Sequence, residues 1–199
     1  MKIGIDIDNV LAELSLVMNL WHKNKYGYFT PNSKRTQFGL TFAWNCSQEE
    51  ATKRLLEFYK SENFKKTPPV KGAIEAINKL AKEHELHAIT ARPIHTEKET
   101  LRWLEKHFSL KNFEKIHINI QCRGDSVCKT KAEICEELGI KLMIEDALHF
   151  ADECAEKGIK VLLLDWPWNQ TNKLHSNITR VKDWKEILEK IDKMTYSPT

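Results

Sequence analysis

The sequence has no run that approaches the roughly 20 consecutive apolar residues a membrane span needs, so we expect no integral membrane protein. No basic segment followed by an apolar stretch opens the chain, and we therefore expect no signal peptide. The formal net charge is only +3, and the basic residues are interspersed with acidic ones. Without a basic stripe, binding to a nucleic-acid polymer has no electrostatic support.

The cysteines are few, and their spacing shows no paired motif. The chain has five cysteines, and no two of them form a CxxC pair: Cys46, Cys122, Cys128, Cys135 and Cys154. An odd number without such a pair argues against a disulfide framework and against a zinc ribbon. We interpret them as reduced thiols and expect a cytoplasmic protein.

The chain is long enough for one full domain, or for a core domain that carries a small insertion. It has 199 residues, of which 41% are apolar and 30% charged, as in ordinary soluble globular proteins. Five segments have the apolar pattern of buried strands: Lys2–Asp8, Glu85–Ile89, Lys115–Ile120, Lys141–Ile144 and Lys160–Leu164. Helices are expected at 12–27, 48–59, 73–81, 96–107, 131–138, 147–157 and 183–193.

From residue 72 onward the expected strands alternate with helices. This pattern predicts an α/β fold with a parallel sheet covered by helices on both faces. Residues 14–67 depart from the alternation, and we interpret them as a helical cap inserted after the first strand. The core would then comprise residues 1–13 and 68–199. Within the cap, residues 28–47 show little periodicity and are rich in aromatic side chains.

Polar residues that suit phosphate chemistry lie at or just after the ends of three predicted strands. These residues are Asp6, Asp8, Thr90, Glu145 and Asp146. In a parallel sheet the carboxyl ends of the strands meet at one edge, where ligands bind. We therefore expect these side chains to converge on one site, although they are far apart in the sequence.

Two carboxylates at such a site can divide the work of phosphoryl transfer. Asp6, ionised, would attack phosphorus, while Asp8, protonated, would give a proton to the leaving oxygen. The carboxylates also suit Mg²⁺, to which Glu145 and Asp146 would add negative charge. Thr90 and the backbone N–H groups after it would hold phosphate oxygens, and Lys131 would neutralise phosphate and nucleophile together.

The motifs resemble those of the haloacid dehalogenase (HAD) superfamily. The run Asp6-Ile7-Asp8-Asn9-Val10-Leu11 resembles its first motif, DxDx[TV][LV]. Thr90 resembles the second motif, Lys131 the third and Ile144-Glu145-Asp146 the fourth, and their order and spread also fit. The resemblance implies a Rossmann-like three-layer core. Glu145 stands where Asp is commoner in this superfamily, and Asn9 where Gly or Asp is commoner.

Two further segments resemble the 5′(3′)-deoxyribonucleotidase family and its bacterial relatives. They are Ile89-Thr90-Ala91-Arg92-Pro93 and Asp165-Trp166-Pro167-Trp168-Asn169-Gln170. The resemblance implies a phosphomonoesterase that forms an aspartyl phosphate on Asp6 and acts on a small phosphorylated metabolite, such as a nucleoside monophosphate. It also implies Mg²⁺ held by Asp6, Asp8, Asp146 and Glu145, a phosphate held by Thr90, Ala91, Arg92 and Lys131, and aromatic cap residues against the base.

Several roles stay open at this level. Lys129 competes with Lys131, Arg92 is either a surface charge or a phosphate clamp, and Thr90 alone also suits a helix N-cap. Glu145 binds the metal directly, binds it through water, or only orients Lys131. The aromatic residues Trp21, Phe29, Phe38, Phe42 and Trp44 fit the core of the cap as well as a base-binding surface. Trp166 and Trp168 fit either the mouth of the site or ordinary packing.

The alternative functions are also set by these residues. A sugar phosphate or other small ester is an alternative substrate, because no core motif residue reads a base. Dehalogenation is disfavoured because it needs no acid at Asp8. A non-catalytic phosphate-binding protein is disfavoured because such proteins usually lose the nucleophile or the acid. The sequence leaves the oligomeric state open, a homodimer included.

Overall fold

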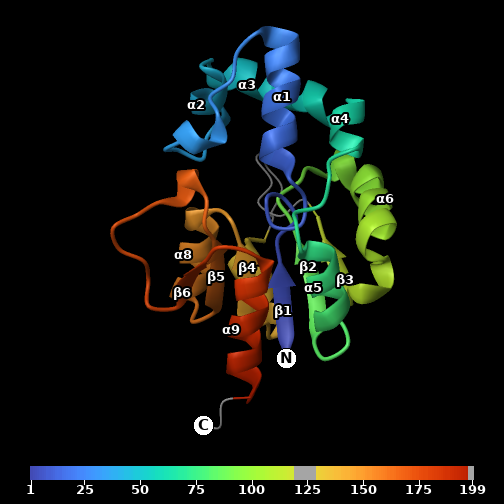
Figure 1. Cartoon of the computed structure of the whole chain (residues 1–199), viewed down its shortest axis with the longest axis vertical. Coiled ribbons are helices and arrows are strands. Elements are labelled where there is room, and N and C mark those ends of the chain that lie inside the picture. Colours follow the sequence, from blue (N-terminus) through green and yellow to red (C-terminus); the bar gives the residue numbers. More distant parts are fainter. Residues whose placement is uncertain (119–128, 197–199) are drawn as a thin grey trace.

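A computed structural model describes residues 1–118 and 129–196 (Figure 1). The strands are β1 (Lys2–Ile5), β2 (Glu85–Ile89), β3 (Lys115–His117), β4 (Leu142–Glu145), β5 (Lys160–Leu164) and β6 (Ile178–Val181). The helices are α1 (Leu14–Tyr26), α2 (Leu40–Trp44), α3 (Gln48–Tyr59), α4 (Glu62–Lys65), α5 (Ala73–Leu80), α6 (Glu97–Phe108), α7 (Lys131–Leu138), α8 (Leu148–Glu156) and α9 (Trp184–Tyr196). Short 3₁₀ turns are η1 (Asn32–Lys34), η2 (Ile94–Thr96), η3 (Leu110–Asn112) and η4 (Pro167–Asn169).

The strands of the described chain form one parallel sheet in the order β3-β2-β1-β4-β5-β6. β1 lies in the middle of the sheet, where Ile5 pairs with Ala88 of β2 on one side and with Ile144 of β4 on the other. The order reverses at β1, since the chain builds outward from it in both directions. The carboxyl ends of β1, β2 and β4 therefore lie side by side, at the switch point where doubly wound sheets bind ligands.

Helices cover both faces of the sheet, as the alternation predicts. One apolar core contains buried residues of α5, α6 and α9, and the other contains buried residues of α7 and α8. The strands read as nearly continuous apolar runs because both of their faces are buried: all four residues of β4 and the last four residues of β2 and of β5 are buried. The predicted three-layer α/β fold is confirmed.

The differences from the expected elements have local causes. β1 ends at Ile5, before Asp6 and Asp8, because the chain turns away from the sheet there. β6 was not predicted, since this edge strand is short and Thr179 and Arg180 are only half-buried, which breaks any apolar pattern. α2 and α4 are too short to show helical periodicity. Residues 119–120 of the third predicted strand, and Cys122 and Cys128, lie outside the described residues.

Helices α1 to α4 lie together beyond the carboxyl ends of the strands (Figure 1). They share a small apolar core of their own, which is built around Trp44 and Phe58. The two segments that connect them to the sheet run side by side: Val70 N–H donates to Leu11 O at 2.7 Å, and Glu13 N–H donates to Pro68 O at 3.0 Å. The division into a core and a cap stays a prediction, but these four helices lie where a cap would meet a ligand.

None of the helices in the described part of the chain is both long and apolar enough to cross a membrane.

Gly4 marks the closest approach between β1 and its surroundings. A Cβ atom there would lie 2.7 Å from Met143 Sδ and 3.2 Å from Ile89 Cδ1. Gly4→Ala should therefore lower the free energy of unfolding by about 1–3 kcal/mol, as overpacking of a full core does. Alanine usually stabilises by restricting the unfolded chain, so a loss in urea unfolding would identify the close contact.

Gly39→Ala is the control for this change. Its added Cβ would meet only Thr41 Oγ1, at an ordinary 3.5 Å. We expect its urea midpoint to stay near that of the wild type. Equal midpoints for the two variants would contradict the tight packing around Gly4.

Candidate active site

Lys131 is the cation at the centre of the predicted site. The Thr130 and Glu133 capping box starts α7, so that Lys131 occupies its first turn and points at the end of β1. Its Nζ lies 2.6 Å from Asp6 Oδ1 and 2.6 Å from Glu145 Oε2, and its side chain is 1% exposed. Burial alone would lower the pKa of Lys131, but the two carboxylates raise it above its ordinary value. Lys131 therefore stays charged.

Lys129, the alternative lysine, lies outside this cluster. Its ammonium pairs with Glu137 on the surface of the protein, where both side chains are more than half exposed. Lys131 is thus the lysine that the structure brings to Asp6.

Both carboxylate oxygens of Glu145 are occupied. Oε2 accepts from Lys131, and Oε1 accepts the backbone N–H groups of Asp146 and Ala147 at 3.0 and 3.1 Å. Glu145 is the last residue of the buried strand β4 and is 0% exposed. This geometry favours the role of orienting Lys131 over that of a direct metal ligand.

Asp6 is a buried carboxylate in a crowded electrostatic environment. Burial raises its pKa from 3.8 to about 7, the Lys131 ammonium opposes the rise, and Glu145 and Asp8 add to it. Lys131 bonds Oδ1, and no described residue donates a hydrogen bond to Oδ2. Oδ2 is thus available to act as a nucleophile or a metal ligand once Asp6 is ionised.

Asp146 is held in place by its neighbours on other loops. Its Oδ2 accepts the Asn9 amide at 3.0 Å and the Trp168 indole N–H at 3.2 Å. Burial raises the pKa of Asp146 well above its ordinary value, and the charges of Glu145 and Asp6 add to this rise. No described residue donates to Oδ1, which is the oxygen left for a ligand.

The backbone conformation and the hydrogen bonds of Asn9 explain why Asn occupies a position where Gly or Asp is commoner in the superfamily. Its φ is +59°, a left-handed conformation that Asn tolerates better than most residues. Its Nδ2 donates to Asp146, while its Oδ1 accepts Ser15 N–H at 2.9 Å at the start of α1. Glycine would permit the turn but make neither bond.

Asp8 and Arg92 form an ion pair on the side of the site that faces α3. Arg92 Nε and Nη2 both donate to Asp8 Oδ1, at 2.9 and 2.6 Å, and the Arg92 side chain is 1% exposed. Arg92 is therefore not a surface charge. In this structure the Arg92 guanidinium is bonded to Asp8 and is not left free for a phosphate. Asp8 Oδ2 accepts no hydrogen bond from the described residues, so Arg92 fixes only Oδ1.

Thr90 lies at the end of β2, fully buried, and its hydroxyl accepts the N–H of Arg92 at 3.2 Å. It does not cap the next helix, because η2 intervenes and Thr96 is the N-cap of α6. Ala91 follows it and is exposed. Thr90, Ala91 and Arg92 thus form the turn beside the two aspartates.

The acidic side chains fit a hard divalent cation. One carboxylate oxygen each from Asp6, Glu145 and Asp146 lies within 4.8 Å of the other two. No described residue donates to the Asp8 backbone carbonyl, which is therefore free to accept a ligand. Mg²⁺ prefers oxygen ligands of this kind. The residues therefore fit such an ion, and Asp6 and Asp146 offer the free oxygens.

The sequence did not identify every residue of this site. Asn9, Trp168 and Asn169 hold Asp146. The sequence signals for them are the family-like segment Asp165–Gln170 and the departure of Asn9 from the usual first motif, and neither assigns a contact to Asp146. Tyr59 of α3 also reaches the site, since burial and then the charge of Asp8 raise its pKa, while Arg92 opposes the rise. Nothing in the helical pattern of α3 singles it out.

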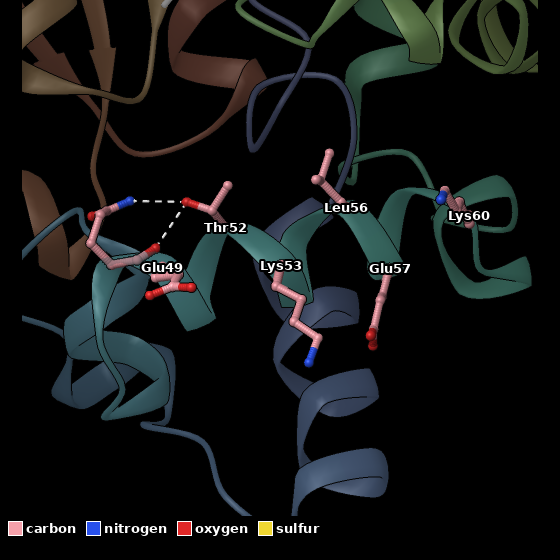
Figure 2. A pocket seen from close by; sticks show the side chains of 7 residues that line it. Glu49, Thr52, Lys53, Leu56, Glu57 and Lys60 are labelled. Carbon is pink, nitrogen blue, oxygen red and sulfur yellow. Dashed lines mark hydrogen bonds between the residues drawn. The ribbon is translucent and has the colours of Figure 1, made fainter.

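A separate hollow of about 680 Å³ lies on the outer side of α3 (Figure 2). Its lining comes from successive turns of this one helix and the residue after it: Gln48, Glu49, Thr52, Lys53, Leu56, Glu57 and Lys60. Sites for small molecules are usually enclosed on several sides. A hollow with one wall does not meet this description, and it contains none of the residues predicted to act in catalysis.

A family model described as 5′ nucleotidase, deoxy (pyrimidine), cytosolic type C protein matches residues 1–195. The chain belongs to this nucleotidase family. It is a phosphoric monoester hydrolase with a HAD-like fold.

Curated relatives of this nucleotidase are similar to it in length. One from Halalkalibacterium halodurans, named "Putative nucleotidase", is 26% identical over 192 residues, which cover 96% of this chain and 92% of the relative. Another of the same name from Bacillus subtilis is 27% identical over 190 residues, which cover 95% of this chain and 92% of the relative. Both align along nearly the whole nucleotidase chain.

Solved structures share the fold. A haloacid dehalogenase-like hydrolase from Streptococcus pneumoniae has a TM-score of 0.69 at 17% identity, covering 96% of this chain and 97% of its own. A predicted phosphatase from Clostridium acetobutylicum also has a TM-score of 0.69 at 17% identity, covering 96% and 98%. Because the identities are low, these similarities show the fold of the nucleotidase alone.

Removing the buried ammonium should destabilise the nucleotidase more than removing a surface one. Lys131→Met leaves Asp6 and Glu145 buried without their cation, and should lower the free energy of unfolding by about 3–5 kcal/mol at pH 8. Lys129→Met removes only an exposed pair and should change it by less than about 0.5 kcal/mol. Urea unfolding in EDTA compares the two variants, and similar losses would contradict the central role of Lys131.

Proposed function

We propose that the protein is a Mg²⁺-dependent 5′-nucleotidase that hydrolyses a nucleoside monophosphate through an aspartyl phosphate on Asp6. The proposal is carried by one observation: Asp6, a buried carboxylate with a free oxygen, is bonded to the buried Lys131 and has an oxygen within 4.8 Å of the acidic pair Glu145 and Asp146. The family supports a small phosphorylated substrate. The proposal that this substrate carries a nucleoside rests on the aromatic side chains of the insertion, residues 14–67.

The first half of the reaction forms the covalent intermediate. Asp6 Oδ2 attacks phosphorus, and the bond between phosphorus and the ester oxygen breaks. The leaving oxygen takes a proton from Asp8 Oδ2, the oxygen that Arg92 leaves free. Arg92 thereby positions Asp8, while Lys131 and the turn of Thr90 and Ala91 bind the phosphate oxygens.

The second half releases phosphate. Water attacks the phosphorus of the aspartyl phosphate and gives a proton to Asp8, and the bond between phosphorus and Asp6 breaks. Asp8 is then protonated again and Asp6 is a carboxylate again, so that the cycle closes without a further reactant.

A bound Mg²⁺ would supply positive charge beside the transferring phosphoryl group and favour the ionised form of Asp6. Asp6, the Asp8 backbone carbonyl and Asp146 would hold it, with water completing about six ligands. Glu145 would act through Lys131 instead. The assignments of Asp146 and of the Asp8 carbonyl follow the oxygens that the hydrogen bonds leave free, while Asp6, whose Oδ2 attacks phosphorus, would share Oδ1 between the ion and Lys131.

Replacing the nucleophile tests this reaction. Asp6→Asn should lower turnover of para-nitrophenyl phosphate on the order of a thousand-fold or more, because the covalent route is lost. Asp8→Asn should still release a burst of nitrophenol, a leaving group that needs little protonation, and then stall as the phosphoenzyme. Quench-flow kinetics and the mass of the trapped Asp6 peptide measure both.

The folded state of each variant is checked by circular dichroism and melting temperature. Near-normal turnover by a folded Asp6→Asn protein would exclude the covalent mechanism. Phosphate on a residue other than Asp6 would assign the nucleophile elsewhere.

Phe38 is the insertion aromatic that we propose as the contact for a base. Its ring meets His149 of α8 edge-on at 5.2 Å, and the side chain is 43% exposed. Trp44, in contrast, is 1% exposed and stacks on His22, so it belongs to the core of the insertion. Phe42 is 37% exposed but has no described ring contact with the sheet domain.

Phe38→Ala should lower kcat/KM for nucleoside monophosphates by about five- to a hundred-fold, the range that corresponds to 1–3 kcal/mol of base stacking. Turnover of para-nitrophenyl phosphate and the melting temperature should stay near wild type. Phe42→Ala is the matched control and should change the turnover of neither substrate. Equal nucleotide kinetics in both variants would favour a sugar phosphate or another small ester as the substrate.

A further inference from the structure

The segment after β5 reaches the carboxylate that follows β4. β5 pairs with β4, with Leu163 opposite Glu145, so the loops after the two strands are neighbours. In the loop after β5, Asn169 Nδ2 donates to Asp146 O and to Leu164 O, both at 2.7 Å. Trp168 Nε1 donates to the Asp146 side chain at 3.2 Å. This loop therefore holds both the backbone and the carboxylate of Asp146.

Only one oxygen of that carboxylate receives hydrogen bonds from the described residues. Oδ2 accepts from Trp168 and from Asn9, whose amide lies 3.0 Å away. The two donors come from different loops, one after β1 and one after β5. With Oδ2 held between them, the carboxylate cannot rotate without losing a bond, and Oδ1 is left for a cation.

The indole of Trp168 is itself fixed. It stacks on Trp166, with ring centroids 4.7 Å apart and planes within 8°, and it is 6% exposed. The Arg35 guanidinium lies 4.8 Å from its ring, although Arg35 belongs to the insertion. Arg35 is 2% exposed and donates to Phe38 O at 2.7 Å, but its Nε has no hydrogen-bond partner among the described residues. An unsatisfied buried donor costs free energy, so hydrogen bonding alone does not explain why Arg35 lies against this ring.

We propose that Trp168 is a positioning residue for the metal site: its indole N–H holds Asp146 Oδ2 so that Oδ1 faces the cation. This inference rests on the proposed function, in which Asp146 is a direct ligand of Mg²⁺. Groups that hydrogen-bond to metal ligands fix their orientation, and their loss typically weakens metal binding about 10- to 100-fold. A tryptophan that only fills space would act through its ring, and its N–H would not matter.

Replacing tryptophan by phenylalanine separates the two roles, because an aromatic ring stays and the N–H is lost. Trp168→Phe should weaken Mg²⁺ binding about 10-fold or more in calorimetry on EDTA-stripped protein. Its kcat on para-nitrophenyl phosphate should recover to within about twofold of wild type at saturating Mg²⁺, since only the affinity is affected.

Trp166→Phe is the matched control. It removes the same N–H from the ring stacked on Trp168, but that N–H donates to the Asn9 carbonyl rather than to a carboxylate. Its Mg²⁺ affinity should stay within about twofold of wild type. The melting temperatures of both variants in EDTA show whether either change acts through stability instead.

The outcomes separate this inference from the proposed function. A folded wild-type protein that binds no Mg²⁺ would overturn the proposed function. A wild type that binds Mg²⁺ and a folded Trp168→Phe protein with the same affinity would overturn the positioning role alone.

If Trp168→Phe does not fold, the wild type still decides. The indole ¹H–¹⁵N resonance of Trp168, assigned by its through-space contacts to Trp166, should shift during a Mg²⁺ titration and saturate at the calorimetric affinity. A resonance that stays fixed while Mg²⁺ binds would contradict the inference.

Discussion

The ammonium of Lys131 between Asp6 and Glu145 is the interaction on which the site depends. Three carboxylates gathered within 4.8 Å of one another repel, and their burial adds a desolvation cost to that repulsion. One buried cation cannot neutralise all of them. The remaining negative charge is what a divalent ion would balance. It also adds to the burial that raises the pKa of Asp6 from 3.8 to about 7.

Each charged group in the site has a fixed partner on another loop. Lys131 forms an ion pair with Asp6, Arg92 forms an ion pair with Asp8, and Asn9 donates a hydrogen bond to Asp146. Asn9 and Arg92 lie in the segments that follow β1 and β2, and Lys131 lies in the first turn of α7. The fold therefore supplies the alignment, while the individual hydrogen bonds decide which oxygen of each carboxylate is free to react.

The sequence predicts most of the sheet because its inner strands are buried on both faces and read as apolar runs. It predicts the convergence of Asp6, Thr90 and Asp146 for the same reason, since strand ends are visible in the pattern. It does not predict β6, whose edge position leaves its middle residues half-buried. Short helices such as α2 also lack enough turns to show a period.

The partners of the acidic residues were harder to predict. The Arg92 to Asp8 pair and the Trp168 to Asp146 bond join residues 84 and 22 positions apart, and no local pattern encodes such distances. The role of Glu145 also depends on two backbone N–H groups, which the sequence cannot display. Residue types at strand ends indicate the chemistry, but three-dimensional contacts assign the atoms.

The paired segments around Leu11 and Val70 carry a consequence for how such proteins diversify. Because the chain leaves the sheet and returns to it through neighbouring, hydrogen-bonded segments, the intervening residues begin and end at almost the same place. A graft of different length or sequence needs only to match those two adjoining ends. The insertion can then change in length and sequence without altering the residues at the edge of the sheet.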